Sequence, residues 1–282
     1  MHIGMTTILE ILSKKEGDDV IYITGDIHAD PRRFSVESFP EQREMSKDDF
    51  VIICGDFGLC WETVESDREK YWLDWLEKKP FTTVFIDGNH EAFDRLNAFP
   101  IEQWQGGRVH KLREHVIHLM RGEIFTLCNR KIFTFGGARS HDITGLATNE
   151  ELKQDYTAGV LKQDDPQLQN KIKMLNKIGI FTRIEGKTWW RAEMPTEQEM
   201  QHGLDVLQLH NMNVDFIVSH DGPASDLALL GGGLLSIDPL NKYFEQIKQT
   251  VSYKWWFFGH HHEDRQITAH DAVLYHQILR IA

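Results

Sequence analysis

The chain has 282 residues, and its 43 acidic and 31 basic side chains give a formal net charge of -12. This excess of acid argues against a general surface for duplex nucleic acid or for a membrane, because both need basic patches. The apolar share of 41% is enough for a large core, and three cysteines form no even framework for a disulfide-stapled secreted protein. The one unusual count is 15 histidines.

The N-terminal stretch predicts a short amphipathic helix with Ile8, Ile11 and Leu12 on one face and Gly17 as its stop. It lacks the basic and long apolar regions of a signal peptide. No stretch approaches the roughly 20 apolar residues that span a bilayer. We therefore expect a cytoplasmic protein.

Short apolar runs that are rich in Val, Ile, Phe and Trp recur along the chain, and most end near a glycine. Runs of this kind indicate buried strands. They are residues 20–24, 50–54, 82–86, 131–135, 214–219 and 254–258.

Helical periodicity appears between several of these strands, at residues 67–79 and 196–210, and Thr196 with Glu199 forms a capping box for the second helix. Alternating strands and helices favour an α/β fold. The simplest organisation is a single domain over residues 1–282. It carries a polar insert at about 138–205 that shapes the substrate cleft.

Within the insert, a helix is expected after Pro166, and residues 181–195 resemble a hairpin or an exposed loop. Trp189 and Trp190 lie in this second segment, and we expect them to pack against the main core rather than to stack on a nucleobase.

Polar side chains follow five of the six predicted strands, at the strand ends where α/β folds bind ligands. They are oxygen and imidazole donors without a thiolate, which suits Zn, Mn, Fe or Ni better than a structural cysteine-type zinc site. The set is Asp26, His28, Asp56, Asn89, His90, His220, His260 and His262.

The spacing of these donors predicts how they share metal ions. Two donors at i and i+2 on an extended segment point to the same side. Asp26 with His28, and His260 with His262, are therefore each interpreted as a pair for one metal. Asp56 can bridge two cations through its two oxygens, and two ions about 3.5–4 Å apart clamp a phosphoryl group.

Five short motifs follow one another in the order D-x-H, G-D, G-N-H-[DE], H and G-H-x-H. They are GDIH (25–28), GD (55–56), GNHE (88–91), SHDGP (219–223) and GHHH (259–262). In this order the chain resembles the calcineurin-like metallophosphoesterases, over nearly its whole length. The resemblance implies a four-layer α/β/β/α sandwich and two divalent ions, with Mn favoured over Fe, Zn or Ni.

The resemblance also implies a role for each donor. His90 is not a ligand but lies over the site and stabilises or protonates the leaving oxygen, while a metal-bridging hydroxide attacks phosphorus. Two divalent ions outweigh the carboxylates and this hydroxide, so the site stays positive in an acidic protein. One ion takes Asp26, His28, Asp56 and His262, and the other takes Asp56, Asn89, His220 and His260.

The second motif departs from the protein Ser/Thr phosphatases, because Leu59 and Cys60 stand where those enzymes carry Asp and Arg. This departure counts against a close relative of calcineurin, and it requires a phosphate clamp from elsewhere in the chain. The candidates, in order of preference, are Arg139, then Arg32 with its neighbour Arg33, and then Arg191. The segments GGARSHD (136–142) and TWWRAEMPTEQE (188–199) resemble a bacterial and phage-type branch of the superfamily.

Other polar residues near the motifs are interpreted as follows. His261 is expected to point away from the site, and His141 with Asp142 is interpreted as a solvated loop rather than a substrate contact. Asp30 and Asp221 either orient neighbouring histidines or serve as plain turn residues. Cys54 and Cys60 are expected to be packed and inert.

The predicted function is a dinuclear metal-dependent hydrolase of phosphate esters, whose partner is a small phosphomonoester or nucleotide rather than duplex nucleic acid or a membrane. A phosphodiesterase or nuclease for cyclic nucleotides or nucleic-acid ends is the first alternative. A non-catalytic scaffold of the same fold is the second, and His90 with the full ligand set argues against it.

Overall fold

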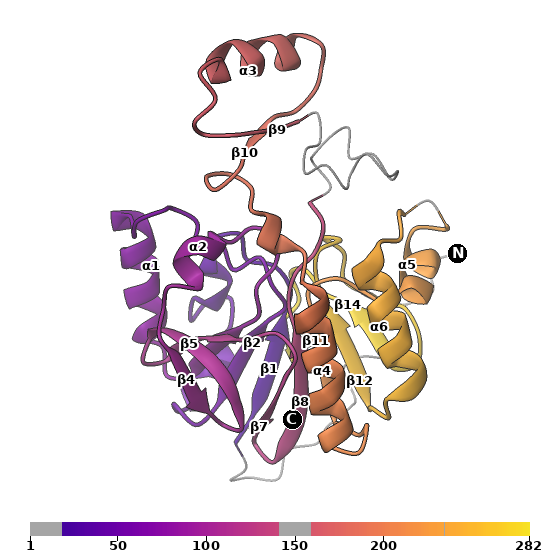
Figure 1. The fold of residues 1–282 in the computed structure, drawn as a ribbon. Coiled ribbons are helices and arrows are strands. Elements are labelled where there is room, and N and C mark those ends of the chain that lie inside the picture. Colours follow the sequence, from indigo (N-terminus) through magenta and orange to yellow (C-terminus); the bar gives the residue numbers. More distant parts are fainter. Residues whose placement is uncertain (1–18, 141–158, 234) are drawn as a thin grey trace, which may run out of the picture.

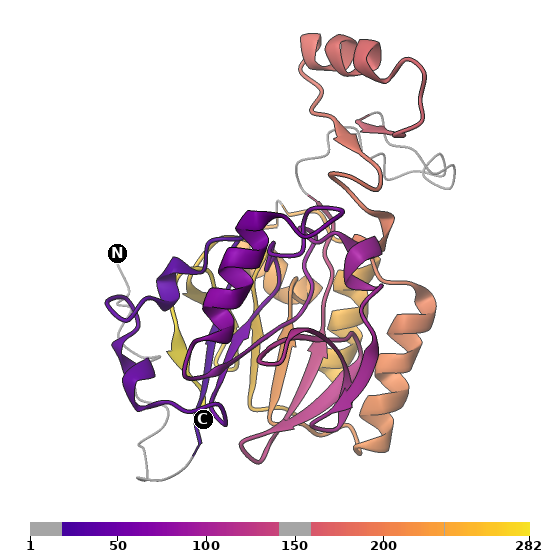
Figure 2. The ribbon, with the colours of Figure 1, turned by 90° about the vertical axis from the view of Figure 1, so that its left-hand side faces the viewer.

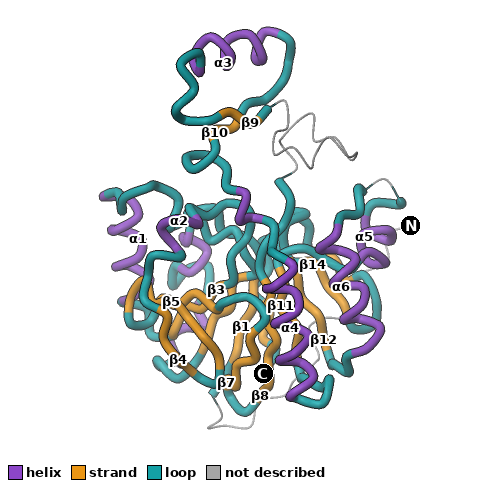
Figure 3. The backbone as a smooth tube through the Cα atoms, in the orientation of Figure 1, coloured by secondary structure: helices purple, strands orange, loops and turns teal. Residues whose placement is uncertain are grey.

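The computed structural model describes residues 19–140, 159–233 and 235–282. Two β-sheets pack face to face, and helices cover both outer faces (Figures 1 and 3). The predicted α/β/β/α sandwich is thereby confirmed. The helix expected before Gly17 and the His141–Asp142 pair lie outside the described residues.

The first sheet has seven strands in the order β15-β1-β2-β3-β6-β5-β4. Its four central strands, β1, β2, β3 and β6, run parallel, and β15, β5 and β4 are antiparallel to their neighbours. The strands are β1 (Ile21–Thr24), β2 (Phe50–Ile53), β3 (Thr82–Phe85), β4 (Ile101–Trp104), β5 (Gly107–Arg113), β6 (Val116–Leu119) and β15 (Leu279–Arg280).

The second sheet has six strands in the order β13-β14-β12-β11-β8-β7, and its four central strands are again parallel. All six strands predicted from the sequence are present, as β1, β2, β3, β8, β11 and β12. The strands of this sheet are β7 (Glu123–Leu127), β8 (Arg130–Phe135), β11 (Phe216–Ser219), β12 (Trp255–Phe258), β13 (Arg265–Gln266) and β14 (Asp271–Val273).

Helix α1 covers the first sheet, and α4, α5 and α6 cover the second. Both predicted helices are confirmed, and the capping box of Thr196 and Glu199 opens α4. The helices are α1 (Asp67–Glu77), α2 (Phe93–Leu96), α4 (Glu197–Leu209), α5 (Ala224–Leu230) and α6 (Pro239–Thr250), with short 3-10 helices at Pro31–Phe34, Pro40–Glu44 and Arg191–Glu193.

Part of the insert projects beyond the sandwich: α3 (Leu168–Lys177) with β9 (Val160–Leu161) and β10 (Arg183–Ile184) (Figures 1 and 2). The helix expected after Pro166 is confirmed as α3. Strand β10 pairs in parallel with β9 instead of forming a hairpin within residues 181–195. The interpretation of the whole chain as a single domain with one insert stays a prediction.

The alternation of side chains along the central strands builds three apolar layers. In β2, Phe50 and Ile52 face the second sheet, whereas Val51 and Ile53 face α1. A strand covered on both faces must be apolar on both, which explains why these strands read as continuous apolar runs. No helix within the described ranges is long and apolar enough to cross a membrane.

Candidate metal centre

The predicted donors converge because β1, β2 and β3 are parallel neighbours in one sheet, while β11 and β12 are parallel neighbours in the other. Their carboxyl ends meet at one edge of the sandwich, where open α/β sheets bind ligands. The donors lie in the loops directly after these strands. Residues more than 200 positions apart, such as Asp26 and His262, come within contact distance of one another there.

The loops that carry these donors are not extended. The φ angles of His28, Asp56, His260 and His262 are 44°, 45°, 66° and 51°, in the left-handed region. Non-glycine residues are rarely held there, and such strained residues cluster at functional sites. The prediction that His260 and His262 form one pair is therefore wrong, because the turn sends their side chains to different groups.

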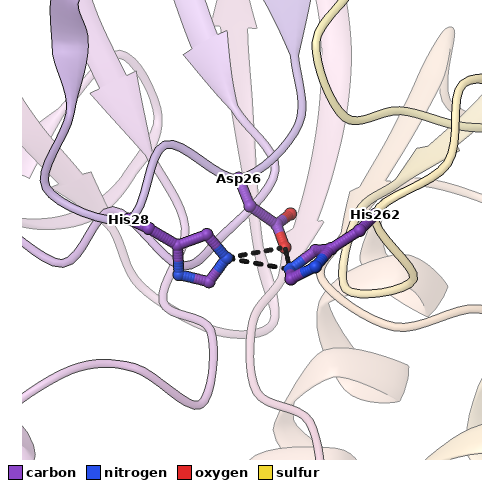
Figure 4. Close-up of side chains that lie close together, drawn as sticks. All are labelled: Asp26, His28 and His262. Carbon is purple, nitrogen blue, oxygen red and sulfur yellow. Dashed lines mark hydrogen bonds and ion pairs between the residues drawn. The ribbon is translucent and has the colours of Figure 1, made fainter.

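The first group consists of Asp26, His28 and His262 (Figure 4). Oδ2 of Asp26 is buried and accepts no hydrogen bond from the described residues, although Nε2 of His262 lies 3.3 Å away and Nε2 of His28 lies 3.7 Å away. The two imidazole nitrogens are 2.9 Å apart. An acceptor buried without a hydrogen-bond donor is costly. A divalent cation at this point would bind the carboxylate oxygen and both imidazole nitrogens, and three protein ligands leave a position for water or substrate.

The second group consists of Asp56, His220 and His260. Nε2 of His220 lies 3.3 Å from Oδ1 of Asp56 and 3.3 Å from Oδ1 of Asn89. Burial alone would lower the pKa of His220, but the carboxylates of Asp56 and Asp26 raise it to about 10. The field at this nitrogen therefore strongly favours positive charge, and a metal cation there would replace the proton.

Asp56 lies between the two groups. Its Oδ1 is close to His220, and its Oδ2 lies 3.8 Å from Nδ1 of His28. Burial would raise the pKa of this carboxyl, but the imidazoles of His220, His90 and His28 hold it well below its usual range. An ionised carboxylate with one oxygen toward each group suits a ligand shared by two ions.

Two glycines permit the close approach of these loops. A Cβ atom on Gly88 would lie 2.1 Å from Oδ1 of Asp56, and one on Gly259 would lie 2.2 Å from Oδ1 of Asp26. Both distances are far below van der Waals contact. The glycines in GNHE and GHHH are thus explained by the space that the carboxylate ligands occupy.

His90 lies beside the groups, with its ring 5.2 Å from that of His28 and 5.4 Å from that of Trp61. Its backbone N–H donates to Oδ1 of Asp56 over 2.8 Å, which fixes its loop relative to the ligands. A pocket of about 230 Å³ opens next to it, lined by residues that include Trp61 and Arg68.

Arg68 was not among the predicted substrate contacts. Its side chain is exposed at the start of α1 and makes no hydrogen bond or ion pair with the part of the chain that the structure describes. The sequence held one signal for it, a basic residue shortly after the second motif and at the N-terminal end of a predicted helix.

The predicted clamp residues are placed differently. Arg139 lies 3.8 Å from the carboxylate of Asp238, and Arg191 lies 3.9 Å from that of Glu185. Neither lines the pocket beside His90.

Arg32 forms a 2.5 Å ion pair with Asp30 and lines a second pocket, of about 650 Å³, together with Tyr275. Arg33 donates to the backbone carbonyls of Asp26 and Tyr275, so it holds the first ligand loop. Asp30 thus partners an arginine rather than a histidine.

His261 points away from the groups and lies 2.9 Å from the carboxylate of Asp221. Asp221 therefore anchors the loop between the ligands His260 and His262. Trp190 packs in a buried cluster with Phe93, and Cys54 and Cys60 are buried. Burial raises the pKa of the Cys60 thiol to about 12.

Comparison with known proteins agrees with this geometry. A family model described as calcineurin-like phosphoesterase matches residues 19–264, a range that contains every donor named above. A search of the curated proteins returned no match. The chain therefore belongs to the calcineurin-like phosphoesterase family and is a metal-dependent phosphoesterase.

Proposed function

We propose that this protein hydrolyses small phosphate monoesters or nucleotides with two divalent ions, of which Mn is favoured. The observation that carries the proposal is the position of Asp56, which faces His28 and His90 on one side and His220 and His260 on the other. A single carboxylate that two imidazole groups flank is the arrangement expected of a shared ligand.

The residues of the site have separate roles in this reaction. The ions, when bound, supply positive charge for the phosphoryl oxygens and a nucleophile near neutral pH. Asp26 and Asp56 bind the ions, and the histidines complete the two groups. His90 lies at the open side, where its imidazole can give a proton to the leaving oxygen.

The pocket beside His90 supports a small leaving group. Its volume of about 230 Å³ is below the roughly 300–1,000 Å³ of sites that enclose drug-sized ligands. We propose that Trp61 packs on the leaving group and that Arg68, which pairs with none of the described residues, attracts the anionic substrate. This assignment places Arg68 before Arg139, Arg32 and Arg191 as the substrate-binding arginine.

The test begins with metal-free protein titrated with Mn²⁺ by calorimetry, where two ions per chain are expected. The loaded enzyme is then compared on p-nitrophenyl phosphate and bis-p-nitrophenyl phosphate. Preference for the monoester supports the proposal, whereas a strong preference for the diester favours the phosphodiesterase alternative. Metal-loaded protein that hydrolyses neither compound, nor any phosphoester of a metabolite panel, would instead indicate a scaffold.

A further inference from the structure

The two ends of the insert meet next to the metal centre through one buried polar side chain each. Ser140 and Glu193 are 5% and 2% exposed. Their side chains meet where the chain leaves β8 and where it returns from the insert, at the 3-10 helix Arg191–Glu193. Burying a carboxyl group costs free energy unless the group is hydrogen-bonded. The hydrogen bonds of Glu193 therefore indicate what holds it in place.

Glu193 accepts two hydrogen bonds from Ser140. The Oγ–H of Ser140 donates to Oε2 over 2.5 Å, and its backbone N–H donates to Oε1 over 3.0 Å. When the Glu193 carboxyl is ionised it can only accept, so the hydroxyl proton of Ser140 points to it and Oγ presents its lone pairs in the other direction.

That direction is the amide of Asn89. Nδ2 of Asn89 donates to Oγ of Ser140 over 3.2 Å, and Oδ1 faces His220. Only the carbonyl end of an amide can bind a cation, because the nitrogen end carries two protons and no lone pair for it. The hydrogen bonds from Ser140 to Glu193 and from Asn89 to Ser140 thus select one orientation of the Asn89 amide. In this orientation Oδ1 of Asn89 faces the second group.

The backbone at Glu193 is clamped in place. Nη2 of Arg121 donates to the carbonyl of Ala192 over 2.8 Å and also contacts that of Glu193, while the same guanidinium forms a 2.6 Å ion pair with Asp87. A Cβ atom on Gly137 would lie 2.6 Å from the carbonyl oxygen of Glu193. These contacts connect the backbone at Glu193, through Arg121, to Asp87 in the loop that carries Asn89.

We propose that Glu193 and Ser140 are positioning residues, which hold the Asn89 amide with its oxygen toward the second metal group. Through them both ends of the insert contribute to metal affinity, although neither Ser140 nor Glu193 is itself a ligand. The inference rests on the proposed two-ion centre and deepens it.

The test uses full-length Ser140→Ala and Glu193→Gln, with the metal-free proteins titrated with Mn²⁺ by calorimetry. Loss of a partner that orients a ligand typically weakens metal affinity 10–100-fold. We expect a loss of about 10-fold or more at one of the two sites and a change of less than about twofold at the other. The electron paramagnetic resonance spectrum of coupled Mn²⁺ pairs should give way to that of single ions at limiting metal.

Thr134→Ala is the matched control, because it removes another buried hydroxyl whose bond goes to the carbonyl of Met120. It should leave both affinities unchanged even if it lowers the melting temperature. A purely structural role for Ser140 would give the same pattern as this control.

A double substitution separates action through Asn89 from general disruption. If Ser140 acts through Asn89, then Ser140→Ala should cause no further loss of affinity in an Asn89→Ala background. Glu193→Gln keeps the size of the side chain and serves if Ser140→Ala does not fold.

Two results overturn the inference. If the wild type binds two ions and both variants bind them with unchanged affinity, only the positioning role fails. If the wild type binds a single ion that neither substitution affects, the proposed two-ion centre fails with it.

Discussion

Asp26→Asn should have opposite effects on stability with and without metal. In the metal-free protein, the carboxylates of Asp26 and Asp56 are 0% and 2% exposed, and the imidazolium of His220 lies 3.3 Å from Asp56. The imidazole of His262 lies 3.3 Å from Asp26, and this contact raises the pKa of His262. When His262 is neutral, Asp26 is a buried charge whose Oδ2 accepts no hydrogen bond from the described residues. Asparagine keeps the shape, still accepts the backbone N–H of His260, and removes the charge.

The magnitude follows from the cost of an unsatisfied buried acceptor, about 1–3 kcal/mol and more when it is charged. We expect metal-free Asp26→Asn to gain about 1–3 kcal/mol in free energy of unfolding. At roughly 2 °C per kcal/mol for a chain of this size, the melting temperature rises by about 2–6 °C. Mn²⁺ at 100 times its Kd adds about 2.7 kcal/mol per site to the wild type and much less to the variant.

The assay is thermal unfolding at pH 8 in chelator and in excess Mn²⁺. The variant should melt above the wild type in chelator and below it in Mn²⁺. Asp215→Asn is the control, since this partly buried carboxylate belongs to neither metal group and lies 2.6 Å from Lys254, and its effect should not depend on metal. An Asp26→Asn variant that melts below the wild type in chelator would refute the reasoning.

Other substitutions test single steps of the proposal. His90→Asn should lower kcat by about 10²–10⁴-fold, the usual contribution of a general acid, while metal analysis still finds both ions; full activity would exclude this role. Asp56→Asn should lower the affinity for both ions in a Mn²⁺ titration, and a variant that still binds two ions tightly would contradict the role of Asp56 as a shared ligand. Arg68→Ala should raise KM for p-nitrophenyl phosphate more than Arg139→Ala does, and equal effects would count against the pocket beside His90. Burial lowers the pKa of His110 to about 4; because the unfolded side chain titrates near 6.5, stability falls as the pH drops from 6.5 toward 4, and His110→Leu should lose less free energy of unfolding between pH 7 and pH 5 in urea titrations.

Several features of the fold could be predicted from the sequence because they depend on neighbours along the chain. The six strands predicted as apolar runs are mostly buried on both faces. The helical period located α1 and α4, and the capping box marked the start of α4. Strands such as β4, with three exposed residues of four, carry no such run and were not predicted. Their pairing is decided by partners elsewhere in the sheet.

Metal binding could also be predicted, because Asp, Asn and His side chains that gather at strand ends are typical metal ligands. The division of the donors between two groups could not follow from the i, i+2 spacing of His260 and His262. That argument assumes an extended backbone, and the left-handed turn at both residues sends each ring to a different group.

Only the tertiary structure identified the residues around the donors. Arg68 reaches the pocket beside His90 from the start of α1, and Glu193 meets Ser140 from 53 positions away. The sequence determined which donors this protein offers, because donor chemistry belongs to each residue type. The packing of loops from distant strands decided their orientation and partners, because hydrogen bonds depend on distance and direction that no spacing along the chain encodes.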